Sequence, residues 1–186
     1  MMPNRGYDMT PTMYSPDGRI YQVEYALETV KRGTLAIGIM TKDGIVLAVE
    51  EKTRPLQVEG ITQKIFQVDD HIGVAAAGYI PDARVQVDNA RYFSQSNKLT
   101  YDEPVDIETV AKHLADQNHQ FTQYSGVRPF GVALIIAGID RKGVNVYVID
   151  PSGTYNSYSA IAIGTGSDEV NEFLEKNYKE GLTIDE

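Results

Sequence analysis

The sequence predicts an α+β fold in which two β-sheets pack face to face between layers of helices, a four-layer αββα sandwich. Apolar runs joined by short turns indicate hairpins, and they follow the order helix, four strands, two helices, about four strands, helix. Runs such as GVALIIAGI are apolar at nearly every position, which is typical of strands covered on both faces. With 186 residues and 42% hydrophobic content, the chain fits one domain with a large core.

The first expected element is a helix within residues 14–32, introduced by the turn SPDG. Its apolar side chains recur at helical spacing and form one stripe, made of Ile20, Val23, Leu27 and Val30. Two hairpins should follow. The first joins TLAIGI to IVLAVE through MTKDG, whose Asp-Gly pair is a strong turn signal, and the second joins KIFQV to IGVAAAG through DDH.

Two helices are expected next, in IPDARVQVDNARYFSQSN and VDIETVAKHLADQNHQFTQY, each with an apolar face for a sheet. Pro81 falls early in the first, where its missing N–H is harmless. Strands resume as FGVALIIAGID and VNVYVID, joined by RKG, and a shorter strand piece lies in TYNSYSAIAIG. The last helix, SDEVNEFLEKNYKE, is expected to start with Ser167 as N-cap and to direct Val170, Phe173 and Leu174 inward.

Composition limits the possible functions. A net charge of −9 and a pI near 4.8 disfavour a nucleic-acid partner. The chain has no apolar run of about 18 residues, and MMPNRGYDMTPTM lacks the apolar centre of a signal peptide, so a cytoplasmic protein without membrane partners is expected. The absence of cysteine excludes disulfides, thiol catalysis and thiolate metal sites.

Most candidate chemical motifs are weak. His113 and His119 are six residues apart on an expected helix, unlike the i, i+4 spacing of helical zinc ligands, and His71 lies elsewhere, so no metal site is expected. GTGSDE at residues 164–169 lacks the features of a phosphate-binding loop and is interpreted as a strand-to-helix turn. No serine stands in a GxSxG context, and no cofactor is expected.

Thr34 poses a sharper question because it starts the first expected strand. If the chain were cut between Gly33 and Thr34, the freed amine could act as base for the threonine hydroxyl. Glu50, at the end of the second expected strand, and Lys64, at the start of the third, are spaced as supporting groups would be. The consistent apolar face of the preceding helix argues against cleavage, because a discarded leader needs no such pattern.

At this point the residues resemble a known family. YSPDGRIYQVEYALETVKRG closely resembles the N-terminal signature of 20S proteasome α subunits, and QYSGVRPFGVALIIAGID resembles a later segment of the same family. The likeness runs from about Tyr7 to the chain end and looks most like the archaeal kind. It implies the sandwich of N-terminal-nucleophile hydrolases, in a subunit that keeps its N-terminal helix across the outer face and is not itself catalytic.

The resemblance also implies partners within a threonine-type endopeptidase complex. These are six further α subunits in a seven-membered ring, a β ring that carries the catalytic threonine, a hexameric AAA ATPase regulator and unfolded protein substrates. In these terms, residues 1–13 would form a gate segment, 14–32 the retained helix and 33–186 the sandwich core. The alternative that remains open is an active threonine hydrolase using Thr34, Glu50 and Lys64 after cleavage.

Site residues carry over from the family only where the motifs match. Tyr7, Asp8, Pro16 and Tyr25 match the cluster that holds the axial gate open. Gly33 and Lys64 match the pocket between subunits that receives the C-terminal tail of an activating ATPase, where a buried lysine could meet a carboxylate. The loop lining the narrow entrance corresponds to Tyr124, Ser125, Gly126 and Val127.

Two departures from the family pattern bear on these expectations. Met9 follows Asp8 where the family usually has arginine, which puts any Asp-Arg link between neighbouring N-termini in question. The sequence ends at Glu186, where family members continue with a further helix and closing strands. A sheet without those strands is expected to show an unpaired edge and an apolar face.

Overall fold

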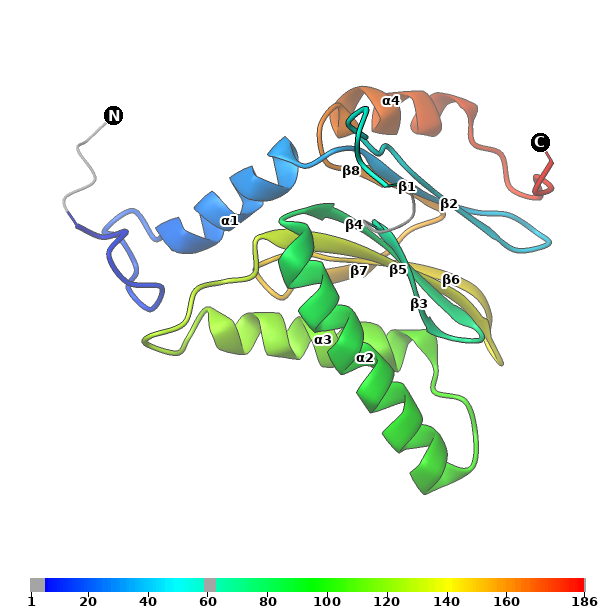
Figure 1. The fold of residues 1–186 in the computed structure, drawn as a ribbon, viewed down its shortest axis with the longest axis horizontal. Coiled ribbons are helices and arrows are strands. Elements are labelled where there is room, and N and C mark those ends of the chain that lie inside the picture. Colours follow the sequence, from blue (N-terminus) through cyan, green and yellow to red (C-terminus); the bar gives the residue numbers. More distant parts are fainter. Residues whose placement is uncertain (1–5, 59–62, 186) are drawn as a thin grey trace.

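The computed structural model of the protein describes residues 6–58 and 63–185, and it has the four layers helix, sheet, sheet, helix (Figure 1). One sheet has five antiparallel strands in sequential order, β3 (Ile65–Asp69), β4 (Ile72–Gly78), β5 (Val132–Asp140), β6 (Gly143–Ile149) and β7 (Tyr155–Ser157). The other has three antiparallel strands in the order β2 (Ile45–Val49), β1 (Ala36–Met40) and β8 (Ala160–Ile163).

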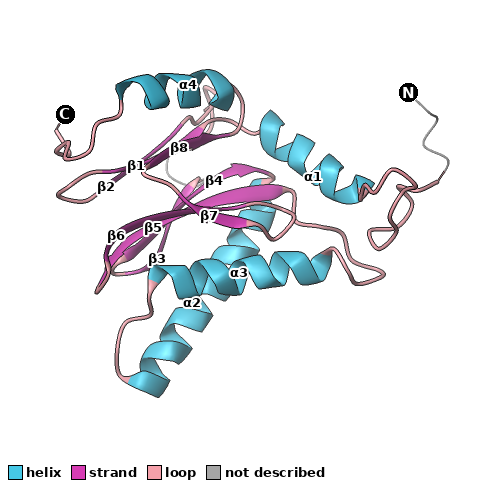
Figure 2. Ribbon diagram, turned by 180° about the vertical axis from the view of Figure 1, so that it is seen from behind, coloured by secondary structure: helices cyan, strands magenta, loops and turns pink. Residues whose placement is uncertain are grey.

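Two helices cover the outer face of the five-stranded sheet, and one lies on the three-stranded sheet (Figures 1 and 2). The first two are α2 (Ile80–Tyr101) and α3 (Ile107–Phe121), and the third is α4 (Ser167–Asn177). The N-terminal helix α1 (Tyr21–Arg32) lies at one end of the sandwich, where it contacts β4 and β5. Both predicted hairpins are confirmed, with Met40 opposite Ile45 in the first.

Strand β5 shows why the central strands are apolar at nearly every position. Leu134 and Ile136 belong to the core between the five-stranded sheet and helices α2 and α3, whereas Ile135 and Ala137 belong to the core between the two sheets. All four are at most 3% exposed. Both faces of β5 are therefore buried, as the uninterrupted apolar run predicted.

Several expected boundaries need correction. The predicted turn SPDG is present, with the N–H of Gly18 bonded to the carbonyl of Ser15 and Gly18 at a positive φ of 77°. The helix begins after it, at Tyr21, so residues 14–20 of the range expected for the retained helix are not helical. The piece TYNSYSAIAIG is two strands, β7 and β8, which belong to different sheets. In α4 the N-cap is Gly166 in the left-handed conformation, so Ser167 is the first helical residue instead.

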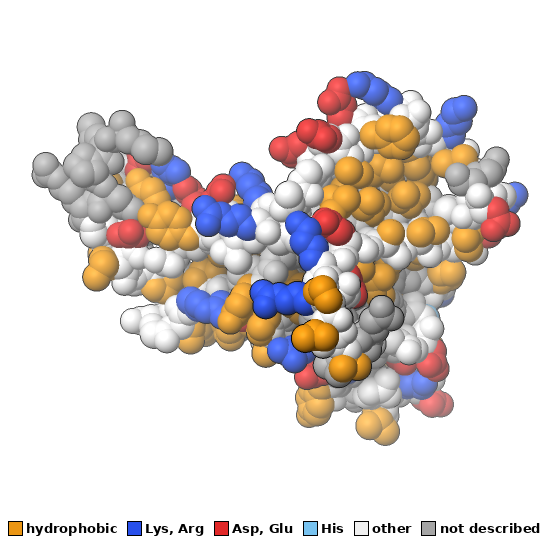
Figure 3. All heavy atoms as spheres, turned by 45° about the horizontal axis from the view of Figure 1, so that its top comes forward, with side chains coloured by type: hydrophobic (Ala, Val, Ile, Leu, Met, Phe, Trp, Pro, Cys, Tyr) orange, Lys and Arg blue, Asp and Glu red, His pale blue; other side chains and the backbone are white. Residues whose placement is uncertain are grey.

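The inward direction expected for Phe173 in α4 is wrong. This side chain is 63% exposed, and Val170 and Leu174 are only partly buried. Figure 3 shows apolar side chains gathered on the face that carries α4 and the three-stranded sheet. The first five residues of the expected gate segment lie outside the described residues.

Candidate functional site

The junction between α1 and β1 is closely packed on both sides. Gly33 caps α1 by donating its N–H to the carbonyl of Val30 at 3.0 Å, and its own carbonyl accepts the N–H of Thr165 at 2.7 Å. The hydroxyl of Thr165 also donates to the carbonyl of Lys31 at 2.8 Å. The turn before α4 therefore holds the peptide bond that precedes Thr34. The prediction of GTGSDE as a strand-to-helix turn is confirmed: it lies between β8 and α4, with Gly164 and Gly166 at positive φ.

Lys64 is buried beside this junction, with 5% of its surface exposed. Its ammonium donates to Thr34 Oγ1 at 2.6 Å and to the main-chain carbonyls of Thr34, Leu35 and Glu50 at 2.9, 3.1 and 3.1 Å. Burial lowers the pKa of Lys64, while Glu50 and Glu51 act in the opposite direction. One ammonium thus ties together the start of β1, the end of β2 and the start of β3.

The trio proposed for the hydrolase alternative is only partly assembled. Thr34 and Lys64 are in contact, but Glu50 contributes its backbone carbonyl, and its carboxylate is 47% exposed with an oxygen 3.8 Å from Lys52. In the intact chain the nitrogen of Thr34 is an amide, whose lone pair is delocalised into the peptide bond. The base that threonine catalysis requires is therefore missing unless the chain is cut.

Three glycines allow α1 to approach the sheet. A Cβ atom added to Gly33 would lie 2.1 Å from the nitrogen of Gly78, and one added to Gly78 would lie 2.4 Å from the carbonyl oxygen of Gly131. Gly78 also adopts a positive φ of 117°. The backbone therefore packs directly against backbone where the end of α1, the end of β4 and the start of β5 meet. A side chain at Gly33 or Gly78 would clash there.

The expected gate residues are partly brought together. The hydroxyl of Tyr25 donates to Asp8 Oδ2 at 3.3 Å, and the side-chain amide of Gln22 donates to the carbonyl of Asp8. Tyr7 is half-buried, whereas Pro16 is exposed in the turn before α1. Met9, which stands where the family pattern has arginine, is 84% exposed. Asp8 is thus bound to α1 of the same protomer, through Gln22 and Tyr25.

The loop at residues 124–127 lies at the same end of the molecule as the N-terminal segment (Figures 1 and 2). A cleft of about 430 Å³ separates the two, with Met9, Thr10 and Pro11 on one side and residues 125–128 on the other. Gln22 of α1 also lines this cleft. Segments predicted separately as gate and entrance are therefore neighbours within one protomer.

An ion pair that the sequence did not reveal anchors this loop. Arg128 binds Asp82, at the start of α2, through both Nη atoms at 2.6 and 2.8 Å. Burial acts to raise the pKa of Asp82, but hydrogen bonds from Arg128 and from the N–H of Gly131 outweigh it and leave the pKa below its usual value. The two residues are 46 positions apart, and no local pattern pairs them.

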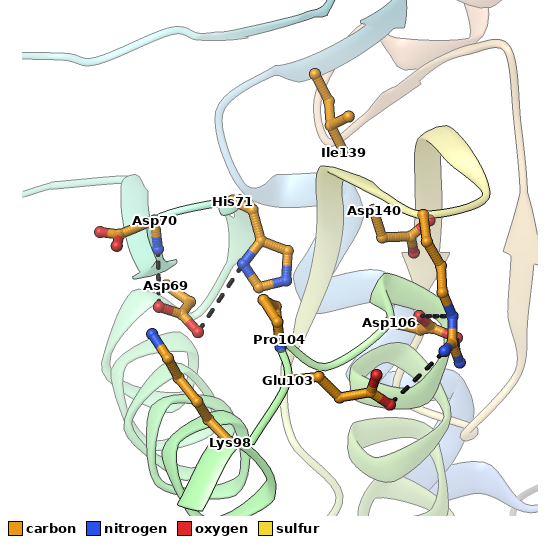
Figure 4. A pocket seen from close by; sticks show the side chains of 10 residues that line it. Asp69, Asp70, His71, Lys98, Glu103, Pro104, Asp106, Ile139 and Asp140 are labelled. Carbon is orange, nitrogen blue, oxygen red and sulfur yellow. Dashed lines mark hydrogen bonds and ion pairs between the residues drawn. The ribbon is translucent and has the colours of Figure 1, made fainter. Parts of the chain in front are cut away.

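A second pocket lies at the opposite end of β5 and has an acidic lining (Figure 4). It measures about 410 Å³, and it includes His71, which hydrogen-bonds to the carbonyl of Val105 at 2.8 Å, and Asp106, which pairs with Arg141. Within the described residues, no group of three or more histidine or acidic side chains is placed to hold a metal ion. The other two histidines, His113 and His119, lie on α3 with ring nitrogens close to Asn89 and Gln123.

None of the described helices is long and apolar enough to cross a bilayer. Comparison with known proteins identifies the family to which the chain belongs. The family model described as proteasome subunit matches residues 30–186, and the model of the N-terminal signature of A-type proteasome subunits matches residues 7–28.

Relatives named as proteasome α subunits are similar over nearly the whole chain. Those of Methanosarcina thermophila and Methanocaldococcus jannaschii are each 49% identical over all of this chain, which spans 75% and 72% of their lengths. That of Saccharolobus islandicus is 50% identical over 97% of this chain and 76% of its own length. The chain therefore belongs to the proteasome subunit family, and within it to the α type found in archaea.

Proposed function

We propose that this chain is a non-catalytic ring subunit of a cytoplasmic 20S core particle, which gates the passage of unfolded polypeptides toward a proteolytic β ring. The observation that carries the proposal is the attachment of Asp8 to α1 by Tyr25 and Gln22, beside the loop at residues 124–127. A segment that is tethered to a kept helix and lies against a loop can move over or away from an opening without rearranging the core.

The retained helix supports a structural rather than catalytic role. The α1 side chains Val23, Ala26 and Val30 are buried, and the glycine contacts at Gly33 and Gly78 seat the helix on the sheet. Removal of residues 1–33 would expose this surface to water, at a cost set by the apolar area uncovered. Cleavage before Thr34 would therefore destabilise the sandwich while creating the nucleophile.

We also propose that the region of Gly33 and Lys64 receives the C-terminal tail of a hexameric ATPase regulator. Because the Lys64 ammonium already donates to four oxygens, a tail carboxylate would have to replace one of the carbonyl contacts. A contact between the ammonium and a carboxylate joins two opposite charges, whereas each carbonyl contact has only one charged partner, so this exchange is favourable in principle. Docking would then loosen the start of β1, next to α1, and so reach the gate segment.

A second candidate function, a threonine hydrolase, is favoured by one observation. The 2.6 Å contact between Lys64 Nζ and Thr34 Oγ1 would help to deprotonate that hydroxyl if a free amine were present. Thr34 would be the nucleophile, with Lys64 as electrostatic support. This function requires loss of residues 1–33.

Native mass spectrometry of the purified chain, alone and with archaeal β subunits, separates the two candidates. A sevenfold species of uncut protomers that hydrolyses peptides only after β is added supports the ring-and-gate proposal. A protomer that begins at Thr34 and is active alone would establish the hydrolase instead. Uncut monomer that never associates with β would contradict the ring proposal for this 186-residue chain.

A further inference from the structure

We propose that the Asp82–Arg128 ion pair is a clamp that positions the loop at residues 124–127 and, through it, the N-terminal gate segment. The proposal rests on the gating function proposed above and assigns positioning residues to it. Neither residue would touch a substrate or the reacting atoms. Their role would be to fix the wall of the cleft in which residues 9–11 lie.

The clamp also involves the backbone of Gly131, whose N–H and carbonyl are both hydrogen-bonded to residues at the start of α2. Asp82 Oδ2 accepts the N–H of Gly131 at 2.9 Å as well as Arg128 Nη1, and the carbonyl of Gly131 accepts the N–H of Tyr79 at 2.8 Å. Both main-chain groups of Gly131 are thus held by the start of α2. The loop between α3 and β5 is therefore held where it enters β5. Only the residues before Arg128 lie outside these contacts with the start of α2.

Burial is divided unequally between the two charged partners. The side chain of Asp82 is 10% exposed, whereas that of Arg128 is 60% exposed and extends over the ring of Tyr79 at 5.6 Å from its centre. A bidentate arginine to a buried carboxylate is geometrically specific, because two parallel hydrogen bonds fix the guanidinium plane. A pair formed for surface charge alone would need no such arrangement.

Arg128 links this anchor to the gate segment. It lines the 430 Å³ cleft with Met9, Thr10 and Pro11, and with Tyr25 it also lines a second cavity of about 360 Å³ against α1. The guanidinium therefore lies between the carboxylate that holds it and the helix to which Asp8 is attached. Loss of the ion pair should release the loop and remove one wall of the seat for residues 9–11.

The chain supplies a matched control for the substitution Arg128→Gln. Arg141, at the other end of β5, also pairs through two nitrogens with a mostly buried carboxylate: its side chain is 67% exposed and that of Asp106 is 12% exposed. Arg141→Gln thus removes a similar ion pair far from the gate. Arg128→Lys keeps the charge but loses the planar fork, and Asp82→Asn keeps an acceptor for Gly131 but loses the charge.

Hydrogen exchange followed by mass spectrometry on the full chain tests the clamp directly. Arg128→Gln should raise exchange about tenfold in residues 122–131 and also in residues 6–13, with α3 unchanged. Arg128→Lys should be intermediate, and Arg141→Gln should change neither segment. Because the two side chains act through the same ion pair, the double variant with Asp82→Asn should exchange no faster than Arg128→Gln.

Two results would overturn the proposal. Unchanged exchange in residues 122–131 would mean that the ion pair does not hold the loop. Faster exchange there with unchanged residues 6–13 would mean that the loop does not seat the gate segment. Both readouts use the isolated chain, so they remain decisive even if the chain fails to assemble with β subunits and the gating function itself is wrong.

In assembled particles the clamp should affect long substrates selectively. Arg128→Gln should slow hydrolysis of an unfolded protein such as casein about threefold, because a released segment obstructs the opening, while a tetrapeptide diffuses past it. Equal effects on casein and tetrapeptide would point to a general assembly defect and would contradict a positioning role. Arg141→Gln particles provide the reference rate for both substrates.

Discussion

Lys64 shows how one charged side chain can organise three strands. Its ammonium donates hydrogen bonds to the carbonyls of Thr34 and Leu35, just before β1, and of Glu50, just after β2. The carbonyl of Leu35 also accepts the N–H of Glu50 at 2.8 Å, so the lysine adds to the backbone hydrogen bond that joins β1 and β2 at this point. The same contacts place a cation at the threonine hydroxyl without making it a nucleophile.

Replacing Lys64 by methionine should lower the free energy of unfolding by about 2 to 4 kcal/mol, because buried acceptors lose their donor. Urea unfolding followed by circular dichroism measures the change. Lys176, which pairs with Glu172 on the exposed face of α4, gives the control substitution Lys176→Met, expected to cost under about 0.5 kcal/mol. Similar midpoints for the two variants would show that the Lys64 contacts do not stabilise the fold.

Gly78 combines a positive φ with crowding, and each can be tested separately. Gly78→Ala should destabilise the protein by about 3 kcal/mol or more, because the new methyl group meets Gly131 and the backbone of Val30. Gly143 has a similar φ of 107° but nothing within 4 Å, so Gly143→Ala should cost only about 1 kcal/mol of backbone strain. Thermal unfolding of both variants measures the difference, and equal losses would argue against a crowded junction.

At the scale of elements, α2 and α3 pack through an aromatic pair as well as aliphatic side chains. The rings of Phe93 and His113 stack with centroids 3.9 Å apart and an angle of 6°, and a ring nitrogen of His113 lies 3.3 Å from Asn89 Oδ1. Burial lowers the pKa of His113, with Asp116 acting weakly in the opposite direction. The folded protein thus favours the neutral imidazole.

This arrangement predicts a loss of stability in weak acid. The unfolded chain binds a proton at His113 near the ordinary pKa of 6.5, whereas the folded chain resists it, so the free energy of unfolding should fall as the pH drops below 6.5. His113→Gln should flatten the profile between about pH 7 and pH 5. His119→Gln, at an exposed position of the same helix, is the control variant.

The elements that sequence patterns located correctly are those whose signal is repeated along the chain. Helical spacing of apolar residues found α1, α2 and α3, and Asp-Gly in MTKDG found the first hairpin. The turn SPDG before α1 was found, but Ile20, counted as the first member of the apolar stripe, is the N-cap with an extended backbone and lies outside the helix. Period alone does not reveal where the backbone changes conformation.

The candidate site was predicted in part, for a related reason. Thr34 was singled out by its place at the start of the first strand and Lys64 by its spacing from it, whereas Asp8 was named only through the resemblance to the family. The contacts that hold the surrounding backbone in place come from distant positions. The N–H of Thr165 binds the carbonyl of Gly33, and Asp82 binds Arg128. Such pairs depend on how the strands are ordered in space, which no local window contains.

At the scale of the whole molecule, the two sheets are unequally protected. The core between the five-stranded sheet and helices α2 and α3 is nearly closed to water, and its central residues are 0 to 2% exposed. The core between the sheets includes partly exposed members from the three-stranded sheet, such as Leu47 and Ile161. On the outer face of that sheet, α4 has no fully buried side chain. Fewer buried contacts hold the three-stranded sheet in place.

The unequal burial of the two sheets predicts that the protein unfolds locally in two steps, with the three-stranded sheet opening first. Native-state hydrogen exchange should give free energies for β1, β2 and β8 that are lower than those of β4 and β5 by about 2 kcal/mol or more. Leu47→Ala should lower the exchange free energies of the three-stranded sheet alone, because that sheet can open while the rest of the protein stays folded.

Leu114, on α3, is fully buried in the larger core, so Leu114→Ala should lower the values of both sheets together. The asymmetry follows because the three-stranded sheet is closely packed only on the face toward the five-stranded sheet, whereas α4, which covers its other face, has no fully buried side chain. A common exchange free energy for both sheets, lowered equally by either variant, would instead make the sandwich a single cooperative unit. In that case loosening of the junction at Lys64 could not be confined to β1 and α1, and regulator docking would have to act on the whole protomer.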